Sequence, residues 1–441
     1  MKLSYKSIIV FIAGIANTIA SPIADNSQAK EGSFRILSYN VGGLPAIISS
    51  SKPQEYTKQI SPKLNAFDIV NVQEDFGYNN ELTSQLQFPY QTDFTGNVPL
   101  GNGLMTFSKF PLCTSTREVW KDTHGFISNG ADQMIPKGFC YSSVEIQTGY
   151  FIDIYNIHTD ADTDEKSLAA RRSNLSQLAE YINNRSAGKA VIIFGDTNSR
   201  YTREGDDVEG LLLKPCNLKD AWIQNVKGGI IPPKGDSLMV HDLGVQGEVV
   251  DKILFRSGKN VEINAATFDL LLTEFTDAEG NQLSDHYPIS SRIDYKLIDN
   301  FLTTDSFGGS GGQGFSFLER IGNGLPKALI VSAGDRIDRI GFMYDTGLVV
   351  VGGNGGEERV YEFQEGEYIT SLTVCKATKN RLSSKRVSFI EITTNLGTKF
   401  SAGKYTNEVM TFTPPNGYAI VGFVGNASNE IDRLGCIYEK L

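Results

Sequence analysis

Short runs of apolar and β-branched residues, each ending in polar residues, recur along the first two thirds of this 441-residue chain. Such runs have the length of a buried strand with a polar C-terminal mouth. They are Phe34–Tyr39, Asp68–Val72, Gly103–Ser108, Tyr150–Ile157, Ala190–Phe194 and Val249–Phe255. Between them, Asp164–Asn183 places apolar side chains at near-helical spacing. Strands mixed with such a helix predict a layered α/β domain over residues 33–295.

The pattern changes after Lys296. A glycine-rich segment, Asp305–Gly314, is followed by β-type alternation and glycine turns without a convincing helix. A partial internal repeat sets Ile337–Gly341 (IDRIG) against Ile431–Gly435 (IDRLG). This repeat predicts an all-β domain with internal pseudo-symmetry over residues 305–441.

The first residues predict the compartment. Lys2 and Lys6 precede an apolar stretch from Ile8 to Ile15, and small residues follow it. This order is typical of a secretory signal peptide, expected over residues 1–20, and it predicts a secreted protein. The stretch is shorter than the roughly 20 residues of a membrane-spanning helix, and no other stretch predicts a transmembrane segment. Three N-glycosylation sequons are compatible with secretion: Asn174, Asn184 and Asn426.

The cysteine count is odd, so at least one of the five is unpaired within a single chain. Bridges between Cys113 and Cys140 and between Cys375 and Cys436 would each stay inside one predicted domain. The connectivity stays open. There is no C-x-x-C motif and no cluster of cysteine with histidine, so the sequence predicts no zinc site.

Net charge bears on the substrate. The chain carries a formal charge of -10. A nuclease meets a backbone with one negative charge per ~1.7 Å of duplex, which this chain as a whole would repel. The charge therefore favours a lipid headgroup or another small phosphodiester over nucleic acid, although a local basic stripe is compatible with it.

Polar clusters stand at the mouths of the predicted strands. They are Tyr39-Asn40, Gln73-Glu74, His158-Thr159-Asp160, Gly195-Asp196-Thr197-Asn198 and Ser284-Asp285-His286, with Asp251 at the start of a further run. A single carboxylate at a strand end is usually a cap or a turn residue. The whole set within one domain predicts an active site.

The residue types of this set suit hydrolysis of a phosphate ester, which needs a deprotonated water and neutralised charge around phosphorus. Glu74 offers oxygen ligands to a hard cation, so Mg²⁺ is expected, with Mn²⁺ or Ca²⁺ as alternatives. His286 is the candidate general base, and Asp251 is the carboxylate that would orient its ring. Asn40 and Asn198 offer amide groups to a phosphate oxygen or to the attacking water.

In this order, YN, QE, a histidine after a strand, GDTN and SDH resemble the endonuclease/exonuclease/phosphatase superfamily, which includes deoxyribonucleases, inositol-polyphosphate phosphatases and neutral sphingomyelinases. The resemblance covers about residues 33–293. It implies an α/β four-layer sandwich like that of DNase I, in which two mainly antiparallel sheets pack face to face with helices outside. The active site would lie between the strand ends.

The resemblance also implies a role for each matched residue. Asn40 and Glu74 would form the metal site, with Asn40 also positioning the phosphate. Asp285 would be a further metal ligand or a structural carboxylate. His158 would contact the phosphate or assist the leaving group. Two histidines match nothing in the pattern and are expected in loops: His124 and His241.

The catalytic residues implied in the same way are Asp196, Asn198, Asp251 and His286. Asp196 and Asn198 would orient the water and stabilise the transition state. Asp251 and His286 would form the base dyad.

Thinner matches concern the subfamily. The segment Asn102–Pro111, Lys137-Gly138 ahead of a strand, and IHTDAD at Ile157–Asp162 resemble the neutral sphingomyelinase branch more than the nucleases. Arginines near the GDTN motif and on the predicted helix are candidates for binding substrate, including a second phosphate, or for packing alone: Arg172, Arg200 and Arg203.

The C-terminal part resembles the jacalin-related lectins through FGGSGGQGF at Phe307–Phe315 and GNASNEIDRLG at Gly425–Gly435. The resemblance implies an all-β prism that holds one sugar. Backbone N–H groups of a glycine-rich loop together with one carboxylate can pair with vicinal hydroxyls. The implied carbohydrate-binding residues are Gly308, Asn429, Glu430 and Asp432. The alternative is a prism that only stabilises the enzyme domain.

Together these features predict a secreted Mg²⁺-dependent phosphodiesterase acting on sphingomyelin-type lipids, with peripheral membrane contact and a lectin module that binds glycans. Two enzymatic alternatives have the same fold, a DNase-like extracellular endonuclease and an inositol-phosphate phosphatase. A third alternative is a non-enzymatic carbohydrate-binding protein. The intact set of catalytic residue types argues against the third.

Overall fold

The computed structural model describes residues 30–44, 52–97, 101–125, 135–298, 301–318, 320–321, 324–378 and 385–441. The predicted signal peptide lies outside these residues. Contacts divide the described chain into two compact units. The N-terminal unit runs to Phe301 and includes Gln313–Ile321, and the C-terminal unit comprises Leu302–Gly312 and Gly322–Leu441.

Two sheets form the centre of the N-terminal unit, and most of their strand pairs are antiparallel. One sheet has the order β11 (Val261–Ala265), β13 (Ile289–Leu297), β1 (Glu31–Asn40), β2 (Ile69–Gln73), β4 (Met105–Ser108) and β3 (Tyr90–Gln91), with β12 (Asp269–Leu270) beside β13. The other has the order β5 (Leu112–Val119), β6 (Gly138–Gln147), β7 (Tyr150–Ile157), β8 (Ala190–Asp196), β10 (Asp251–Arg256) and β9 (Lys219–Asp220).

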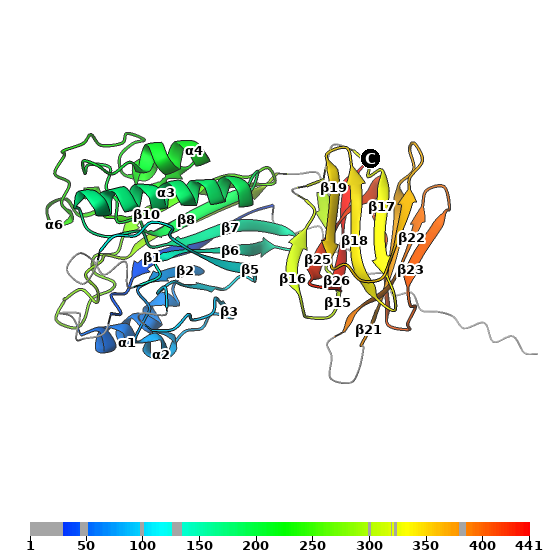
Figure 1. Ribbon diagram of the computed structural model, residues 1–441, viewed down its shortest axis with the longest axis horizontal. Coiled ribbons are helices and arrows are strands. Elements are labelled where there is room, and N and C mark those ends of the chain that lie inside the picture. The colour runs from blue at the N-terminus through cyan, green and yellow to red at the C-terminus, as the bar shows by residue number, and fades with distance from the viewer. Residues whose placement is uncertain are drawn as a thin grey trace, which may run out of the picture. The chain divides into compact units, whose positions relative to one another are not determined.

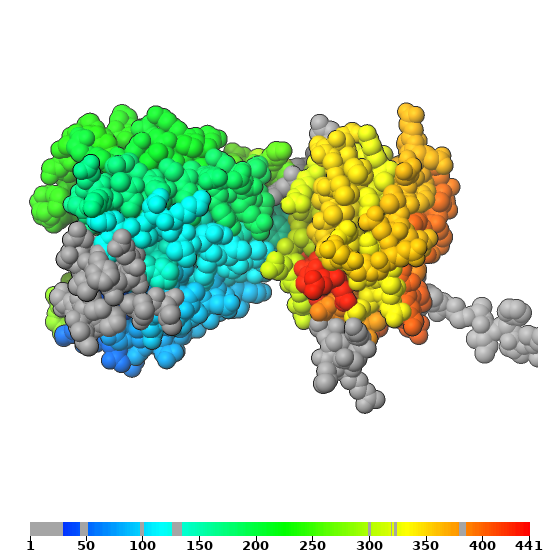
Figure 2. Space-filling view, viewed as in Figure 1, coloured from blue at the N-terminus to red at the C-terminus, as the bar shows by residue number. Residues whose placement is uncertain are grey.

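Helices cover the outer faces of both sheets, which gives four layers. In Figure 1, α1 and α2 lie on one side of the paired sheets, and α3 and α4 lie on the other. The space-filling view shows the same division, with a blue surface on one side and a green surface on the opposite side (Figure 2). The helices are α1 (Pro53–Leu64), α2 (Asn79–Thr83), α3 (Glu165–Arg185), α4 (Lys214–Cys216), α5 (Ala221–Asn225) and α6 (Val240–Leu243), with a π-helical turn η1 (Glu209–Leu213) and a 3-10 turn η2 (Gly244–Gln246).

Buried amide side chains join the two sheets through the core. Asn71 on β2 donates to the carbonyl of Phe194 on β8 at 2.9 Å. Gln73 donates to Asn156 on β7 at 2.7 Å, and Asn156 donates to the carbonyl of Val72 at 3.0 Å. Because a buried amide without partners would cost a few kcal/mol, about 1–3 each, these bonds fix how the sheets align. Gln73 directly precedes Glu74, and Asn156 lies two residues before His158, so these bonds lie next to the strand ends that carry the site.

Strand direction explains why the polar clusters meet. β1 runs parallel to β2, and β7 runs parallel to β8, so the polar residues that follow these strands come out at one edge. β10 is antiparallel to β8 and begins at Asp251, directly opposite Asp196. β13 is antiparallel to β1 and begins just after His286. Residues distant in sequence therefore converge.

All six predicted strands are present, with ends displaced by a few residues: Phe34–Tyr39 in β1, Asp68–Val72 in β2, Gly103–Ser108 in β4, Tyr150–Ile157 in β7, Ala190–Phe194 in β8 and Val249–Phe255 in β10. The predicted helix is α3, and the Asp164 side chain caps it by accepting from two backbone N–H groups. Helix α1, whose interior contains Pro62, was not predicted. Proline lacks a backbone N–H and is unfavourable inside a helix, so Pro62 argues against a helix when the sequence is read alone.

The C-terminal unit contains strands only, within the part of it that the structure describes. One sheet has the order β19 (Gly347–Gly352), β18 (Ile337–Tyr344), β17 (Ala328–Ala333) and β20 (Glu357–Glu362). The larger sheet runs through β14 (Phe301–Thr303), β26 (Ile431–Lys440), β25 (Tyr418–Ala427), β21 (Ile369–Ala377), β22 (Arg386–Thr394) and β23 (Lys399–Gly403). Shorter strands are β15 (Phe307–Gly308) and β24 (Val409–Phe412). The absence of a helix in this described part agrees with the sequence pattern.

The suggested disulfides are not formed, and all five cysteines are free. Cys140 on β6 lies opposite Arg117, whereas the neighbour of Cys113, Thr114, lies opposite Ser143, so the first pair is out of register. Cys375 on β21 is separated from Cys436 on β26 by β25. Neither pair meets the short Cα separation that a disulfide requires.

The sequon at Asn174 is not accessible for glycosylation in the folded protein, because the Asn174 side chain is fully buried. It accepts from the Asp160 N–H and donates to the Asp122 carbonyl. Asn184 is exposed and Asn426 is partly exposed. Among the helices of the described residues, none is long and apolar enough to cross a bilayer.

Candidate active site

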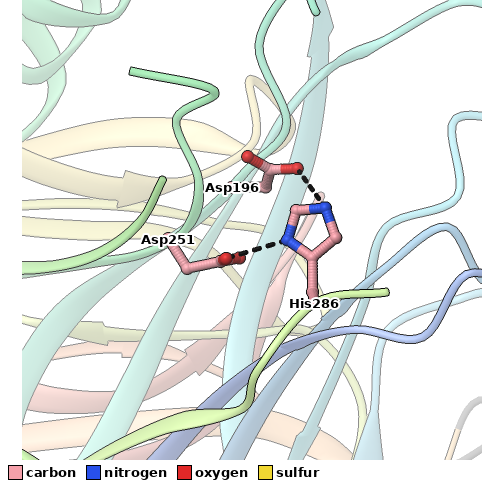
Figure 3. A group of neighbouring side chains, drawn as sticks. All are labelled: Asp196, Asp251 and His286. Carbon is pink, nitrogen blue, oxygen red and sulfur yellow. Dashed lines mark hydrogen bonds and ion pairs between the residues drawn. The ribbon is translucent and has the colours of Figure 1, made fainter. Parts of the chain in front are cut away.

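A histidine between two buried aspartates forms the centre of the strand-end cluster in the N-terminal unit (Figure 3). Asp251 Oδ2 lies 2.8 Å from His286 Nδ1, and Asp196 Oδ2 lies 3.7 Å from His286 Nε2. Burial disfavours the imidazolium, but Asp251 and Asp196 outweigh it and raise the pKa of His286 well above its usual value. The contact at Nδ1 fixes the ring and directs Nε2 toward the reaction space.

A second histidine approaches Asp196 from β7. His158 Nε2 lies 3.5 Å from Asp196 Oδ2 and 3.9 Å from Glu74 Oε1. Burial, reinforced by the charge of Lys137, lowers the pKa of His158 to about 3. The ring is therefore neutral near pH 7, and it can donate one hydrogen bond without carrying a charge.

Asp196 remains ionised within this cluster. Burial opposes its charge, but the neighbouring His286 and His158, together with the Asn198 backbone N–H at 2.8 Å, hold the pKa of Asp196 below its usual value. A buried carboxylate that stays ionised can orient a water molecule or a histidine proton.

Asn40 joins the two carboxylates that the sequence placed on different strands. Its Nδ2 donates to Glu74 Oε1 at 3.1 Å and to Asp196 Oδ2 at 3.2 Å. Its Oδ1 accepts the backbone N–H of Gly42 at 3.1 Å, which fixes the amide orientation. Burial raises the pKa of Glu74, although Lys137 and Asn40 act against the rise.

Two site residues have left-handed backbones that are rare outside glycine, Glu74 with φ 59° and Asn198 with φ 46°. Surrounding bonds hold Glu74 in place, since its carbonyl accepts the N–H groups of Gly43 at 3.1 Å and Phe76 at 3.0 Å. Such strain is typical of functional sites, where the surrounding structure offsets its cost of about 1–3 kcal/mol.

Lys137 belongs to the cluster but was not predicted as a site residue. It is buried, and its positive charge lowers the pKa of Glu74 and of His158. The signal in the sequence was Lys137-Gly138 at the start of β6, which was recognised only as a subfamily feature. A lysine at a strand start has no periodic signature that separates a buried site residue from an exposed one.

Asp285 lies at the rim and is exposed. Its carboxylate accepts from the Ser284 hydroxyl at 3.2 Å, and its charge raises the pKa values of Glu74 and His286.

The Asn198 side chain links two loops at the strand ends. Its amide donates to the carbonyl of Thr159 at 3.0 Å, so it connects the loop after β8 with the loop after β7.

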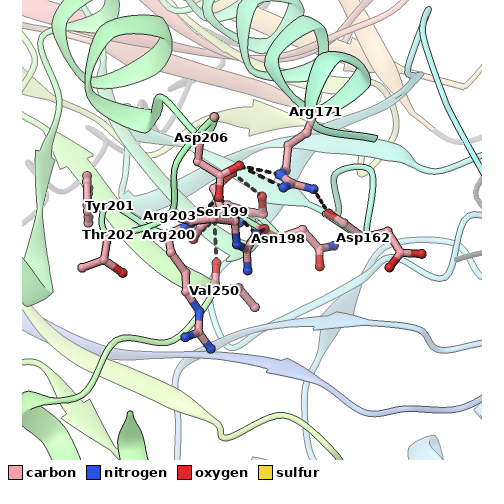
Figure 4. Close-up of polar contacts among 12 residues, drawn as sticks. Asp162, Arg171, Asn198, Ser199, Arg200, Tyr201, Thr202, Arg203, Asp206 and Val250 are labelled. Carbon is pink, nitrogen blue, oxygen red and sulfur yellow. Dashed lines mark hydrogen bonds and ion pairs between the residues drawn. The ribbon is translucent and has the colours of Figure 1, made fainter. Parts of the chain in front are cut away.

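The three arginines proposed as substrate ligands occupy different places. Arg203 bonds the carbonyl of Asn198 at 2.7 Å and the carboxylate of Asp206 at 3.1 Å, so it holds the loop together (Figure 4). Arg172 on α3 donates to the carbonyl of Gly205 at 2.7 Å. Only Arg200 lines the same cavity as Asp251, Asp285 and His286.

This cavity has a volume of about 280 Å³. Its walls include Met239, Val240 and His241 from the segment around α6, besides Tyr287 next to His286. Met239 is 40% exposed, and the nearby Leu243 and Val245 are 41% and 37% exposed. An apolar rim therefore borders the candidate site. His241 was expected in a loop, but it lies in the short helix α6 and lines this cavity.

The residues present fit a divalent cation. Glu74, Asn40 and Asp285 offer oxygen ligands of the kind that Mg²⁺ and Ca²⁺ prefer, and the partly buried Glu74 carboxylate gains by proximity to a cation. Asp196, Asp251 and His286 also lie within 4.8 Å of one another. Because His286 Nδ1 already bonds Asp251, this trio suits proton transfer better than ligation.

In the C-terminal unit, Gly308 and Asp432 of the predicted sugar site are adjacent. A Cβ on Gly308 would lie 2.2 Å from the Asp432 carbonyl oxygen, which explains the glycine. The Asp432 carboxylate is fully buried and pairs with Arg386 at 2.8 Å. Glu430 pairs with Arg336 at 2.5 Å, and Asn429 is exposed.

Two family models match the sequence. Residues 37–286 match the Endonuclease/Exonuclease/phosphatase family, and residues 304–437 match the Jacalin-like lectin domain. The predicted fold classes, an α/β four-layer sandwich followed by an all-β prism, agree with these matches and with the observed sheets.

Curated relatives match in the same two regions. Sphingomyelinases of Mycobacterium tuberculosis and Mycobacterium bovis are 36% identical over 280 residues, which is 61% of this chain and 54% of each relative. The chain thus spans about half the length of these relatives. Jacalin-related lectin 14 of Arabidopsis thaliana is 30% identical over 132 residues, 28% of this chain and 21% of the relative.

Solved structures with similar parts include a beta toxin from Staphylococcus aureus, with 20% identity, a TM-score of 0.44 and coverage of 58% of this chain and 99% of the toxin. Sphingomyelinase C from Streptomyces griseocarneus has 17% identity, a TM-score of 0.43 and coverage of 59% and 99%. Calystegia sepium agglutinin has 20% identity, a TM-score of 0.29 and coverage of 33% and 99%. Since the first family model spans more than half of the sequence, the chain belongs to the Endonuclease/Exonuclease/phosphatase family and carries a jacalin-like lectin domain.

Proposed function

We propose that the N-terminal unit is a Mg²⁺-dependent phosphodiesterase that hydrolyses sphingomyelin-type lipids, and that the C-terminal unit binds glycans. The observation that carries the first part is the contact of His286 with Asp251 at 2.8 Å, next to the linked Asn40 and Glu74. A base, its orienting carboxylate and an oxygen-rich cation site then lie within one cluster.

In the proposed reaction, Nε2 of neutral His286 takes a proton from the attacking water while Asp251 holds the ring in the required tautomer. Asp196 and Asn198 orient the water. His158 and Lys137 donate hydrogen bonds or positive charge toward the phosphate oxygens, where charge accumulates in the transition state.

Glu74, Asn40 and Asp285 would hold the cation. When bound, it would neutralise phosphate charge, stabilise the leaving oxygen and favour the neutral form of the nearby imidazole. Oxygen-only ligands favour Mg²⁺, with Mn²⁺ or Ca²⁺ as substitutes.

The apolar rim supports a lipid substrate. Met239 is exposed on the cavity wall, and Leu243 and Val245 are exposed in the same segment of the chain, where a nuclease of this fold would be expected to present basic side chains to a phosphate backbone. The net charge of -10 also favours a lipid over nucleic acid as the substrate. The sphingomyelinases that are 36% identical to this chain agree with this choice.

We also propose that the protein is secreted, on the basis of the signal-peptide pattern at Lys2–Ile15. A lectin domain on the same chain would then concentrate the enzyme on surfaces that carry glycans. Peripheral contact of the apolar rim with the lipid surface would bring the headgroup to His286.

The substrate and metal dependence can be tested with the full chain. Sphingomyelin vesicles, plasmid DNA and an inositol polyphosphate are incubated in parallel with Mg²⁺ or with EDTA. We expect phosphocholine release from sphingomyelin, lowered at least about 100-fold by EDTA because charge neutralisation by a metal is worth several kcal/mol. Mg²⁺ in excess of EDTA should restore the activity.

Nicked DNA with intact lipid would replace the proposal by the nuclease alternative, and phosphate release from the inositol compound alone would replace it by the phosphatase alternative. Activity on sphingomyelin that persists in EDTA would contradict the metal site.

A further inference from the structure

The loop after the GDTN motif holds one arginine, Arg200, by its backbone on both sides. The Arg200 N–H donates to Asp206 Oδ2 at 2.9 Å. The next two residues, Tyr201 and Thr202, donate their N–H groups to the Glu248 carboxylate at 2.5 and 3.2 Å. Asp206 and Glu248 are both buried, so two buried carboxylates fix the point from which the Arg200 side chain extends.

The guanidinium of Arg200 differs from those of the arginines around it. Arg171 and Arg203 both bond the Asp206 carboxylate. Among the described residues, no hydrogen bond or ion pair involves the Arg200 side chain, although its Nε atom is shielded from solvent. In Figure 4 this side chain points away from the Asp206 carboxylate. The Arg200 side chain therefore does not hold the loop together.

Arg200 lines the cavity of about 280 Å³ that also contains Asp251 and His286. It is the only lysine or arginine among the described residues of the cavity wall. Glu74 and Asn40, which are proposed to hold the cation, are not part of this wall. Arg200 therefore adds positive charge to a different part of the site from the one that the cation would occupy.

The carboxylates that line the same cavity are engaged by other groups. Each is bonded to, or paired with, a neighbour: Asp251 with His286, Asp285 with Ser284, and Glu248 with Lys252. Arg200 is partly buried, and a guanidinium that is partly withdrawn from water gains free energy when an anion bonds to it. Its positive charge is thus available to an anion from outside the chain.

A phosphate group matches this position. The planar guanidinium presents parallel N–H donors that fit two oxygens of one phosphate. His286 belongs to the same wall, and the attacked phosphorus must lie near Nε2 of this ring because the base activates the attacking water. A second phosphate on the substrate would need a further cation, and the described wall contains no other lysine or arginine. The reacting phosphate is therefore the anion that fits best.

We propose that Arg200 is a further catalytic residue, which binds a non-bridging oxygen of the phosphodiester that is hydrolysed. The inference rests on the proposed phosphodiesterase function of the N-terminal unit. Negative charge increases on the phosphate oxygens in the transition state, so a fixed guanidinium beside them lowers the barrier. Because Arg200 contacts the phosphate, its contribution does not depend on the headgroup.

The test uses two substrates that share only the phosphodiester, sphingomyelin in vesicles and bis(para-nitrophenyl) phosphate, with the full chain and Mg²⁺. Arg200→Met should lower kcat about 100-fold on both substrates, which is the effect of removing one donor from a preorganised site of this kind. Arg200→Lys keeps the charge but loses the parallel donors, so its kcat should fall only about tenfold.

Two further measurements separate this role from a structural one. Inorganic phosphate should inhibit Arg200→Met at least about tenfold more weakly than the wild type, because a charge-assisted contact is lost. The melting temperature of Arg200→Met should stay within about 2 °C of the wild type, since the side chain has no bonding partner among the described residues.

The matched control is Arg292→Met. Arg292 is exposed on β13 and pairs with Asp294 at 3.0 Å. This variant should keep kcat within about twofold of the wild type on both substrates, as expected for a surface substitution.

Unchanged kcat of Arg200→Met on both substrates would overturn the inference. A loss on sphingomyelin alone would also overturn it, because the contact would then be with the headgroup or the lipid, and a melting temperature that falls together with kcat would assign Arg200 a structural role instead. A wild-type chain that hydrolyses bis(para-nitrophenyl) phosphate but not sphingomyelin would overturn the proposed lipid substrate, while the variants on the artificial diester would still decide the role of Arg200.

Discussion

Replacing His286 by alanine should lower kcat for phosphodiester hydrolysis by about 1,000-fold, within the range of about 10²–10⁴ that general base catalysis contributes. The reason is geometric, since Nε2 of this ring faces Asp196 across 3.7 Å and Nδ1 is held by Asp251 at 2.8 Å. Asp251→Asn should also lose activity, because an amide opposite Nδ1 no longer imposes the tautomer that leaves Nε2 free to accept a proton. Steady-state kinetics on sphingomyelin vesicles measures both variants.

The control for this prediction is His124→Ala. The His124 ring contacts the exposed end of α3, where Nε2 lies 3.7 Å from Asp164 Oδ1. This variant should keep activity within about twofold of the wild type, as expected for a surface substitution. Full activity of His286→Ala would exclude His286 as the base.

Replacing Arg171 by leucine should destabilise the N-terminal unit by about 3–5 kcal/mol, the cost of breaking a buried ion pair from one side. The Arg171 guanidinium is 1% exposed and bonds Asp206 Oδ1 at 2.9–3.0 Å. It also donates to the carbonyls of Asp160 and Asp162 at 2.9 and 2.8 Å. Figure 4 shows Arg171 on its helix with contacts to Asp206 and to Asp162.

These bonds tie together the loops that follow His158 and Asn198, so the same variant should lose activity at temperatures where it remains folded. The melting temperature should fall by about 10 °C for a unit of this size. Arg172→Ala is the matched control for stability, because Arg172 is partly exposed and, within the part of the chain that the structure describes, donates one hydrogen bond, to the Gly205 carbonyl. Equal melting temperatures for the two variants would contradict the role given to Arg171.

The convergence of the site could be predicted because each polar cluster is adjacent to a strand in sequence. Asn40 and Asp196 end β1 and β8, and Asp251 begins β10, so local patterns already placed all three at strand mouths. What the sequence could not provide is which strands are neighbours. Pairing between β1 and β13, separated by more than 240 residues, depends on long-range packing.

Unknown strand neighbours also explain why the sequence did not predict two buried charged residues, Arg386 and Lys137. Arg386 reaches Asp432 from a different strand, and nothing near Asp432 in sequence indicates a buried cation. Lys137 is buried at a strand start where exposed lysines are far more common. The cysteine pairs failed because strand register and strand order, not domain membership, decide whether two thiols can meet.

The internal repeat was visible in the sequence as IDRIG and IDRLG, but only the structure shows which parts of the fold it repeats. In the structure, Gly355 and Gly356 pack against the Asp338 carboxylate. Gly311 and Gly312 pack in the same way against that of Asp432, so the repeat includes a glycine loop around an aspartate as well as a strand. Local sequence similarity alone could equally reflect the pseudo-symmetry of a β domain.

The central claim is that the strand-end cluster activates water to attack phosphorus. It is tested most directly by hydrolysis of sphingomyelin in ¹⁸O-labelled water with Mg²⁺, followed by mass spectrometry of both products. The account predicts that phosphocholine carries one ¹⁸O atom and that ceramide carries none. Label in ceramide, or no label in either product, would contradict it.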